Sequence, residues 1–261
     1  MENFHTKIDE GNSSTPNESL SKKINEQWYW ERIAENLDVL KEKKVVDYYL
    51  LCNKLKNIIR TGWIEWKVQR ERLESIAEHI FWVQMLALAM NSEYEYDIDI
   101  MKVIYMLAIH ELWETIIWDL TQFQITKEEK EKIEHEAVHN VLSSMLNWKE
   151  IEDLFLEFDA HKTPEAKFAY QCDKLECDIQ CKLYDQEWCV DLSHQEGNKI
   201  ANNKLVKELL KNGESWSDMW LKFWQKKYQY DDNFMSVSNY VKDNYIDLED
   251  NNGGAESWTQ V

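Results

Sequence analysis

One feature constrains the fold of this chain most. It is a short apolar run that is followed directly by an imidazole and two carboxylates. Val103–Ile109 contains no charged residue, and His110 and Glu111 follow it at once, with Glu114 one turn further on. A helix that is apolar on nearly all faces is a buried helix. Charged groups and an imidazole at its end are costly to bury unless something pairs with them. A divalent metal ion is the usual partner, so the segment predicts a buried metal site.

Helical periodicity extends over most of the 261 residues. Apolar side chains recur at helical spacing, hairpin signals are nearly absent, and the chain contains only 2 Pro and 6 Gly. These features predict an all-α fold. We expect one helical domain at 25–245 between disordered polar segments at 1–24 and 246–261. Its helices are expected near residues 26–40, 44–59, 74–91, 98–116, 127–146, 149–158, 163–186, 198–211, 215–228 and 233–244.

The net charge of the chain limits the kinds of molecule that it can bind. The 49 acidic residues outnumber the 30 basic ones, which gives a net charge of −19. Such a chain is a poor match for a nucleic acid backbone, although one metal and one arginine can reverse the field locally for a small phosphorylated substrate. No signal peptide or run of 18 apolar residues is seen, and the five cysteines fit small buried residues in a reducing compartment. We expect a cytoplasmic protein that binds neither nucleic acid nor membrane.

Two further segments place potential metal ligands at the edges of apolar helix faces. His79 opens a helix that is apolar on most faces, and Asp173 borders the apolar stripe of residues 166–183. A lone histidine in such a place is more often a hydrogen-bonded core residue. Together with His110 and Glu111, however, these residues offer two imidazoles and two carboxylates from three helices, which suits a borderline divalent metal. Glu176 lies one turn after Asp173, and two acids at this spacing repel unless a cation lies between them.

Four short motifs follow one another along the chain: Arg60-Thr-Gly-Trp63, Glu74-Ser-Ile-Ala-Glu-His79, His110-Glu-x-x-Glu114-x-x-x-x-Asp119 and Ala169-Tyr-Gln-Cys-Asp173-Lys-Leu-Glu176. As an ordered set they resemble the HD-domain metal-dependent phosphohydrolases, and within them the 5′-deoxynucleotidase branch. The resemblance covers roughly residues 44–190. It implies a single-domain helical HD-type bundle, a homodimer and a divalent metal cofactor, which would be Co, Mn, Zn, Fe or Ni.

The resemblance also implies which residues hold the metal and what the protein does. The implied ligands are His79, His110, Glu111 and Asp173. The implied reaction is hydrolysis of (deoxy)nucleoside 5′-monophosphates to nucleoside and phosphate, with a nucleotide as the small-molecule substrate.

Four more residues receive roles from the same resemblance. Glu114 would activate or orient the attacking water, Asp119 would hold the substrate sugar, and Arg60, with Trp63 near it, would meet the phosphate. The spacing agrees in part, because His110 and Glu114 are four residues apart and share one face of a continuous helix. Asp119 lies about 180° from His110 on an ideal helix, so it reaches the same pocket only if the helix ends near residue 117.

The chain departs from the family pattern at two places. Its second ligand pair is His-Glu instead of His-Asp, and the longer glutamate requires the metal to shift or the helix to adjust. Trp118 stands where glycine is expected, and Trp82, Trp148 and Trp188 occupy positions where glycine would be unsurprising. With 13 Trp and only 6 Gly, the chain is either genuinely rich in tryptophan or contains tryptophan where a codon of the source means glycine. The codons under Trp118 and Trp188 distinguish the two.

Other functions remain open at this point. The same fold could hydrolyse a nucleoside triphosphate or a guanosine alarmone, or it could bind a nucleotide with little turnover. A separate motif, His135-Glu136-Ala-Val-His139, matches the H-E-x-x-H pattern of zinc proteases, with His161 as a candidate third ligand. The charged run at 127–132 before it favours a solvated helix instead.

Overall fold

The computed structural model of the chain describes residues 41–117 and 127–247. All of these belong to the compact unit that begins at Lys41, and the unit Met1–Leu40 lies outside the described residues. The helix expected near 26–40 therefore lies outside the described part of the chain, as do the N-terminal segment and nearly all of the C-terminal segment expected to be disordered. The limits of the predicted domain at 25 and 245 stay predictions.

The described residues form helices and no strand, apart from one isolated antiparallel bridge between Ile59 and Ser75, so the all-α prediction is confirmed. None of the helices in these residues has the length and hydropathy needed to span a bilayer. In chain order the elements are α3 (Lys41–Cys52), the 3-10 helix η1 (Asn53–Asn57), α4 (Thr61–Glu65), α5 (Ile76–Tyr94), α6 (Ile100–Ile109), α7 (Glu114–Ile117), α8 (Lys127–Leu142), α9 (Trp148–Ala160), α10 (Pro164–Gln186), α11 (Lys204–Lys211), α12 (Trp216–Lys227) and α13 (Asp232–Asp243).

Local sequence explains where several helices begin. Ser75 caps α5 through a capping box, in which its side chain accepts from the Glu78 amide while Glu78 binds the Ser75 amide. Thr163 caps α10, and Pro164 occupies its first position. The helix expected at 198–211 begins only at Lys204, because Asn198 Oδ1 accepts from the amides of residues 200 and 201 and forms a turn instead.

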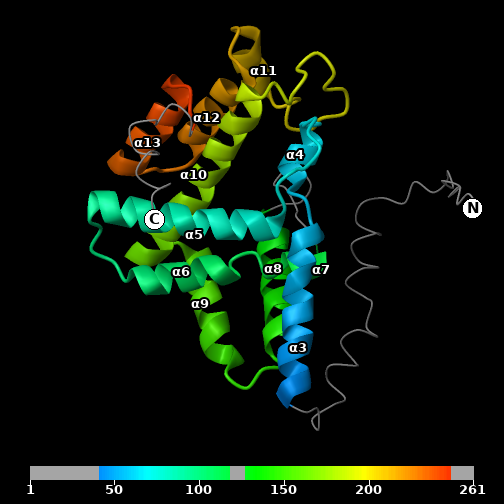
Figure 1. Cartoon of the computed structure of the whole chain (residues 1–261), viewed down its shortest axis with the longest axis vertical. Helices are drawn as coiled ribbons and strands as arrows, with labels where there is room; N and C mark the ends of the chain where they lie inside the picture. The colour runs from blue at the N-terminus through cyan, green and yellow to red at the C-terminus, as the bar shows by residue number, and fades with distance from the viewer. Residues whose placement is uncertain (1–40, 118–126, 248–261) are drawn as a thin grey trace, which may run out of the picture. The chain divides into compact units, whose positions relative to one another are not determined.

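Helix α10 is the central element of the bundle. It packs against α5, α6 and α9 on one side and against α12 and α13 on the other (Figure 1). Its Phe168, Cys172 and Leu175 join an apolar core with α5, α6 and α9. Its Cys181 and Tyr184 join a second core that is rich in tryptophan, with Trp63, Trp66, Trp216, Trp220 and Trp224. The charged residues Asp173, Lys174 and Glu176 lie between the two cores along α10, where burial makes polar partners necessary.

The helix expected at 98–116 is interrupted, and this part of the prediction was wrong. Helix α6 ends at Ile109, and the next residues are held by bonds between residues three apart, such as that from the Glu114 amide to the Glu111 carbonyl. In a continuous α-helix the Glu114 amide would bind the His110 carbonyl, but that oxygen accepts from the indole N–H of Trp113. His110 and Glu114 therefore do not share a helix face. In such a tight turn Glu111 and Glu114 lie on the same side instead.

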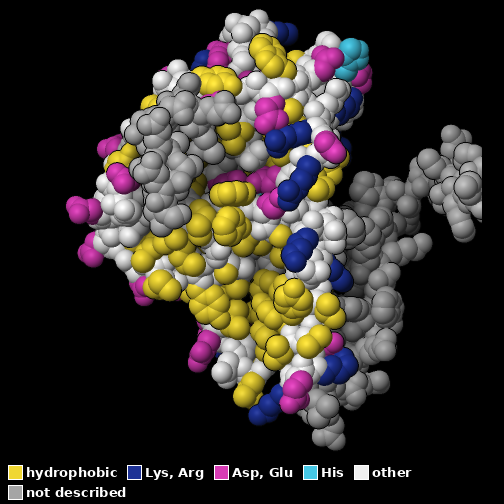
Figure 2. Space-filling view, in the orientation of Figure 1, with side chains coloured by type: hydrophobic (Ala, Val, Ile, Leu, Met, Phe, Trp, Pro, Cys, Tyr) yellow, Lys and Arg dark blue, Asp and Glu magenta, His cyan; other side chains and the backbone are white. Residues whose placement is uncertain are grey.

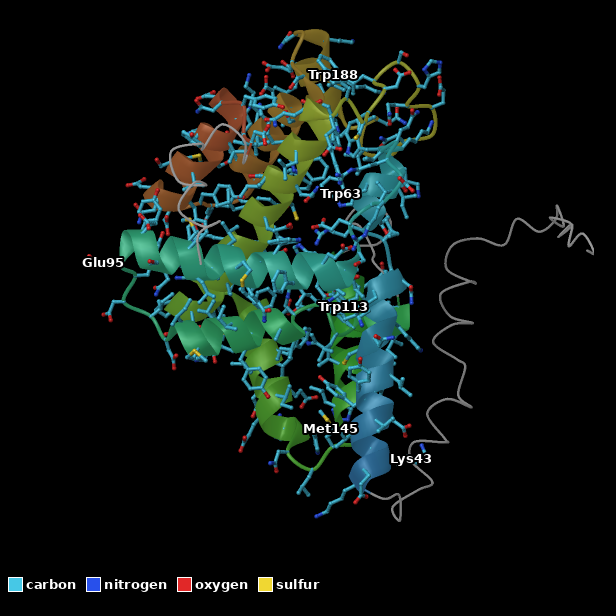
Figure 3. All side chains as sticks on the ribbon, in the orientation of Figure 1. Lys43, Trp63, Glu95, Trp113, Met145 and Trp188 are labelled. Carbon is cyan, nitrogen blue, oxygen red and sulfur yellow. The ribbon has the colours of Figure 1, made fainter. Side chains whose placement is uncertain are left out.

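Trp188 occupies a position that favours glycine. It follows the last turn of α10 with a positive φ of 58°, and its side chain is 91% exposed (Figure 3). Glycine is the usual residue in this left-handed position after a helix, because a Cβ atom is crowded there. Trp118, where glycine is expected most strongly, lies outside the described residues.

We expect Trp188→Gly to stabilise the protein by about 1 kcal/mol, because it removes the cost of the left-handed backbone and loses little packing. A rise of roughly 2–4 °C in Tm should accompany it. Trp148→Gly is the matched control: Trp148 lies in α9 and packs on His139 and Lys149, so its replacement should destabilise. Equal losses in both variants would show that the Trp188 backbone is not strained.

Asp178 of α10 gives the fold a pH dependence. The side chain is fully buried and accepts hydrogen bonds from Tyr230 Oη at 3.0 Å and Ser238 Oγ at 3.2 Å. Burial raises its pKa from 3.8 to about 8. Since the folded state holds this proton more tightly than the unfolded chain, its stabilising contribution is complete below about pH 4 and is lost as the pH rises to about 8.

We therefore expect Asp178→Asn to gain stability relative to the wild type as the pH rises from 4 to 8, by up to about 1.4 kcal/mol per pH unit. Urea unfolding at several pH values measures this difference. Asp153→Asn, which removes an exposed carboxylate of α9, should leave the pH profile nearly unchanged. Parallel profiles of the wild type and Asp178→Asn would contradict the prediction.

Candidate metal centre

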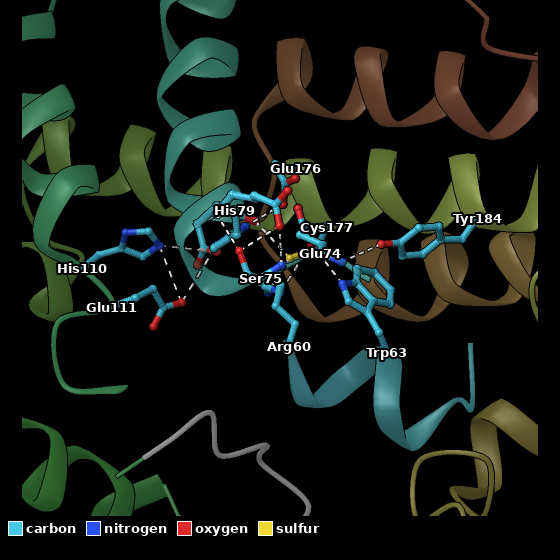
Figure 4. Close-up of polar contacts among 12 residues, drawn as sticks. Arg60, Trp63, Glu74, Ser75, His79, His110, Glu111, Glu176, Cys177 and Tyr184 are labelled. Carbon is cyan, nitrogen blue, oxygen red and sulfur yellow. Dashed lines mark hydrogen bonds and ion pairs between the residues drawn. The ribbon is translucent and has the colours of Figure 1, made fainter. Parts of the chain in front are cut away.

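The structure brings together the donor atoms of four residues that lie far apart in the sequence. His79 comes from α5, His110 caps the end of α6, Glu111 follows in the turn, and Asp173 comes from α10. One donor atom from each lies within 4.8 Å of all the others. His79 Nε2 lies 3.1 Å from Asp173 Oδ1, and His110 Nε2 lies 3.6 Å from Glu111 Oε1 (Figure 4). The longer glutamate of the His-Glu pair thus reaches the same point as the other ligands.

The outer nitrogen of each imidazole is held by a second partner. His110 Nδ1 lies 2.7 Å from the carbonyl oxygen of Leu107, which can only accept, so this nitrogen carries the hydrogen and Nε2 has the free lone pair. His79 Nδ1 lies 2.6 Å from Glu176 Oε2. Carboxylate and carbonyl partners of this kind orient metal-binding histidines in proteins.

Burial and neighbouring charges set the protonation states of His79 and Asp173. Burial lowers the pKa of His79 well below its ordinary value, and the nearby Arg60 guanidinium acts in the same direction, so His79 is neutral. Burial opposes ionisation of Asp173, but the Lys174 ammonium, 2.6 Å from Oδ2, and His79 hold its pKa well below the ordinary value. The cluster therefore offers a neutral imidazole beside an ionised carboxylate, which is the state that binds a metal.

A separate observation indicates that these four donors fit a divalent ion. His110 Nε2 is buried and has no hydrogen-bond partner among the residues that the structure describes. An unsatisfied buried nitrogen is rare and costly. It faces the carboxylates of Glu111 and Asp173, at 3.6 and 4.0 Å. Two imidazole nitrogens and two carboxylate oxygens suit Zn, Fe, Co, Ni or Mn.

Glu176 is a member of the site to which the sequence assigned no role. The spacing predicts a cation between Asp173 and Glu176, but the structure places the His79 ring there, with one carboxylate on each nitrogen. Burial raises the pKa of Glu176 well above its ordinary value, and the neighbouring Glu74 carboxylate acts in the same direction. The repeated acids on one edge of α10 were the signal that could have identified this role.

Arg60 lies beside the cluster and contacts polar side chains. Its Nη2 donates to Cys177 Sγ at 2.9 Å, and its Nε lies 3.9 Å from Glu74 Oε2. The same Glu74 oxygen accepts from the indole N–H of Trp63 at 2.9 Å, and Tyr184 Oη accepts from the Glu74 amide (Figure 4). Trp63 is almost fully buried and stacks on rings of the tryptophan-rich core. The resemblance implies a Trp63 near the phosphate, whereas the structure places its side chain in the core.

Glu114 and Asp119 are the two remaining residues of the predicted site. Glu114 opens α7 and is 1% exposed, one tight turn after Glu111. Asp119 lies outside the described residues, so the predicted turn that would bring it to the pocket stays a prediction.

The two histidines of the H-E-x-x-H motif contact different carboxylates. His135 Nε2 lies 2.8 Å from Asp159 Oδ2, and His139 Nδ1 lies 2.7 Å from Glu152 Oε1, so each pairs with its own carboxylate of α9. His161 packs against the ring of Tyr170, with centroids 3.9 Å apart. These contacts favour helix packing between α8 and α9 over a protease site.

Comparison with known proteins assigns the class. The model of the HD domain family matches residues 52–212, which is more than half of the chain. The chain therefore belongs to the HD-domain family, and it is a hydrolase of the metal-dependent phosphohydrolase type.

Particular relatives place it within this family, in the 5′-deoxynucleotidase branch. The 5′-deoxynucleotidase HDDC2 of Dictyostelium discoideum is 33% identical over 59% of this chain and 82% of the relative. The 5′-deoxynucleotidase hdd1 of Schizosaccharomyces pombe is 30% identical over 73% of this chain and all of the relative. The crystal structure of the PH0347 protein from Pyrococcus horikoshii OT3 matches 76% of this chain and 98% of its own, with a TM-score of 0.53 and 24% identity, which supports the fold alone.

Proposed function

We propose that the protein hydrolyses (deoxy)nucleoside 5′-monophosphates to nucleoside and phosphate with the help of a divalent metal. The observation that carries the proposal is the buried cluster of four donors in which His110 Nε2 lacks a hydrogen-bond partner among the described residues. The names of the relatives support a phosphomonoester substrate, since both are 5′-deoxynucleotidases.

The proposed ligands are His79, His110, Glu111 and Asp173. A divalent ion bound there supplies Lewis-acid activation of water and of the phosphoryl group. The protein holds its histidines for this purpose through Glu176 and the Leu107 carbonyl, and it pairs the second oxygen of Asp173 with Lys174.

Arg60 and Glu114 are the proposed catalytic residues. Arg60 neutralises charge on the phosphate, because its guanidinium stays protonated and lies next to the donor cluster. Glu114 takes the proton of the attacking water, as it follows Glu111 by one tight turn. Asp119 remains the proposed contact of the substrate sugar. For Trp63 we propose a different role from substrate contact: its indole N–H holds the Glu74 carboxylate that lies beside Arg60.

Phosphate release from a panel of nucleotides tests the proposal. The full chain is loaded in turn with Co, Mn, Zn, Fe or Ni and given deoxynucleoside and nucleoside 5′-monophosphates, triphosphates and a guanosine alarmone. We expect metal-dependent release of inorganic phosphate from the monophosphates. Release of pyrophosphate or triphosphate instead would make it another HD-type hydrolase. Nucleotide binding by the metal-loaded protein without any release would make it a binding protein.

A further inference from the structure

The side chain of Lys174 lies close to the donor cluster instead of extending into water. Figure 2 shows Lys and Arg side chains at the surface of one face of the molecule, and those of Lys43 and Lys149 are 62% and 59% exposed. The side chain of Lys174 is 24% exposed. Its Nζ atom lies 2.6 Å from Oδ2 of Asp173, one of the four proposed metal ligands. An ammonium group that loses water in this way needs other partners.

Helix geometry alone does not produce this ion pair. Asp173 and Lys174 are adjacent in α10, and neighbouring residues of an α-helix point about 100° apart around its axis. The pair therefore forms because other groups hold the lysine side chain toward the aspartate. Those groups are two aromatic rings, since Nζ lies 5.1 Å from the ring centroid of Tyr170 and 5.7 Å from that of Tyr228. The face of an aromatic ring attracts an ammonium group within about 6 Å of its centroid.

The two tyrosines come from different parts of the chain, and each is held by a further ring. Tyr170 precedes Lys174 by one turn on the same face of α10, and its ring packs against His161 with centroids 3.9 Å apart. Tyr228 follows the end of α12, and its ring is parallel to that of Trp224 with centroids 4.9 Å apart. Tyr228 lies after the last residue that the HD-domain model matches. Helix α12 thus contributes to the metal centre through this lysine.

The contact with Lys174 decides which oxygen of Asp173 is available to the cluster. A carboxylate can give one or both of its oxygens to the same ion. Here Oδ2 pairs with the ammonium, while Oδ1 faces the Nε2 atoms of His79 and His110. A catalytic metal centre needs positions that stay open for water or substrate. We propose that Lys174, held by Tyr170 and Tyr228, is a positioning residue that restricts Asp173 to a single oxygen ligand, and this inference rests on the proposed function.

Lys174→Met tests the proposal in the full chain, because it removes the charge and keeps most of the side-chain length. The variant should still bind one cobalt ion per chain, but with a weaker visible absorption, since the freed Oδ2 adds a ligand and changes the coordination geometry. Its kcat for a deoxynucleoside monophosphate should fall about 10–100-fold, the usual effect of losing an outer partner of a metal ligand. KM should change little, because the proposed role involves no contact with the substrate. Lys174→Arg should restore the spectrum and most of kcat, since a guanidinium also pairs with carboxylates and stacks on aromatic rings.

Matched variants control for packing. Lys182→Met removes another half-buried lysine of α10, whose Nζ donates to the Lys242 carbonyl at 3.1 Å, and should leave the spectrum and kcat unchanged. Tyr228→Leu should show the changes of Lys174→Met in part, whereas Tyr228→Phe keeps a ring beside the ammonium and should lose much less. Circular dichroism verifies the fold of each variant, and the two Tyr228 variants test the proposal if Lys174→Met does not fold.

Two outcomes would overturn the role of Lys174. One is a wild-type spectrum and kcat in folded, cobalt-loaded Lys174→Met. The other is a loss in Lys174→Met that Lys174→Arg does not restore, because the side chain would then act through packing alone. The cobalt spectrum needs no nucleotide, so a changed spectrum without phosphate release from the wild type would support Lys174 and contradict the proposed substrate. A wild-type protein that binds no cobalt would contradict the metal centre and this inference together.

Discussion

Replacing Asp173 with alanine is expected to abolish metal binding and, with it, phosphate release. Asp173 Oδ1 lies 3.1 Å from His79 Nε2 and 4.0 Å from His110 Nε2, so it faces both imidazoles at once. Changes to outer-shell partners of metal ligands typically cost 10–100-fold in affinity, and we expect the loss of a ligand to exceed about 100-fold. Elemental analysis of the purified protein gives the metal content, and phosphate release gives the activity.

Two controls keep this result interpretable. Asp173→Ala leaves the buried Lys174 ammonium without its carboxylate, which can destabilise the fold, so Asp173→Asn is the milder variant with the same expected loss of metal. Asp153→Asn is the matched control, since Asp153 also pairs with a lysine at 2.6 Å but is exposed on α9. It should keep the metal and the activity. One bound metal per chain in folded Asp173→Ala would remove Asp173 from the site.

Glu114→Ala is expected to keep the metal and lower the turnover of deoxynucleoside monophosphates by 10²–10⁴-fold. This is the usual effect of removing a general acid or base. Glu114 is buried one tight turn after the proposed ligand Glu111, so it can act near the metal without being a ligand. Steady-state phosphate release and elemental analysis of the same preparation measure both quantities.

Two further variants distinguish a chemical role of Glu114 from a role in packing. Glu114→Gln preserves the shape of the side chain and should be as impaired as Glu114→Ala. Glu152→Gln, which changes a buried glutamate of α9 that pairs with His139 and Lys149, should turn over like the wild type. Wild-type turnover in metal-loaded Glu114→Gln would mean that Glu114 has no part in the reaction.

At His110 the helix before it was predictable, but the place where that helix ends was not. The apolar run before it predicted a helix buried on nearly all faces, but α6 buries only the face of Val103, Met106 and Leu107 and exposes Met101 and Tyr105. Where that helix ends could not be predicted, because no glycine or proline marks the end. It ends where the indole of Trp113 occupies the His110 carbonyl, and this side-chain contact carries no signature in helical periodicity. Because the helix ends there, His110 and Glu114 do not share a helix face.

Trp63 and helix α5 give two further examples of what the sequence does not predict. The motif placed Trp63 near Arg60, but only the packing of α4 against α10 and α12 decided that its ring enters the core while its N–H holds Glu74. The charge-free stretch of α5 was visible in the sequence as a buried helix. That one of its faces stays exposed in a single chain appears only after the bundle is assembled.

The sequence by itself determined the helical class, the motifs of the HD-domain family and the four side chains offered to a metal. The helical class follows from local periodicity, and the motifs and candidate ligands follow from residue type and from the resemblance to the family, none of which needs knowledge of the fold. Tertiary structure alone decided that residues 79, 110, 111 and 173 meet, and that Glu176 holds His79. The physical reason is that their approach depends on how α10 packs between α5, α6 and the tryptophan-rich core, and contacts between distant segments arise only from that packing.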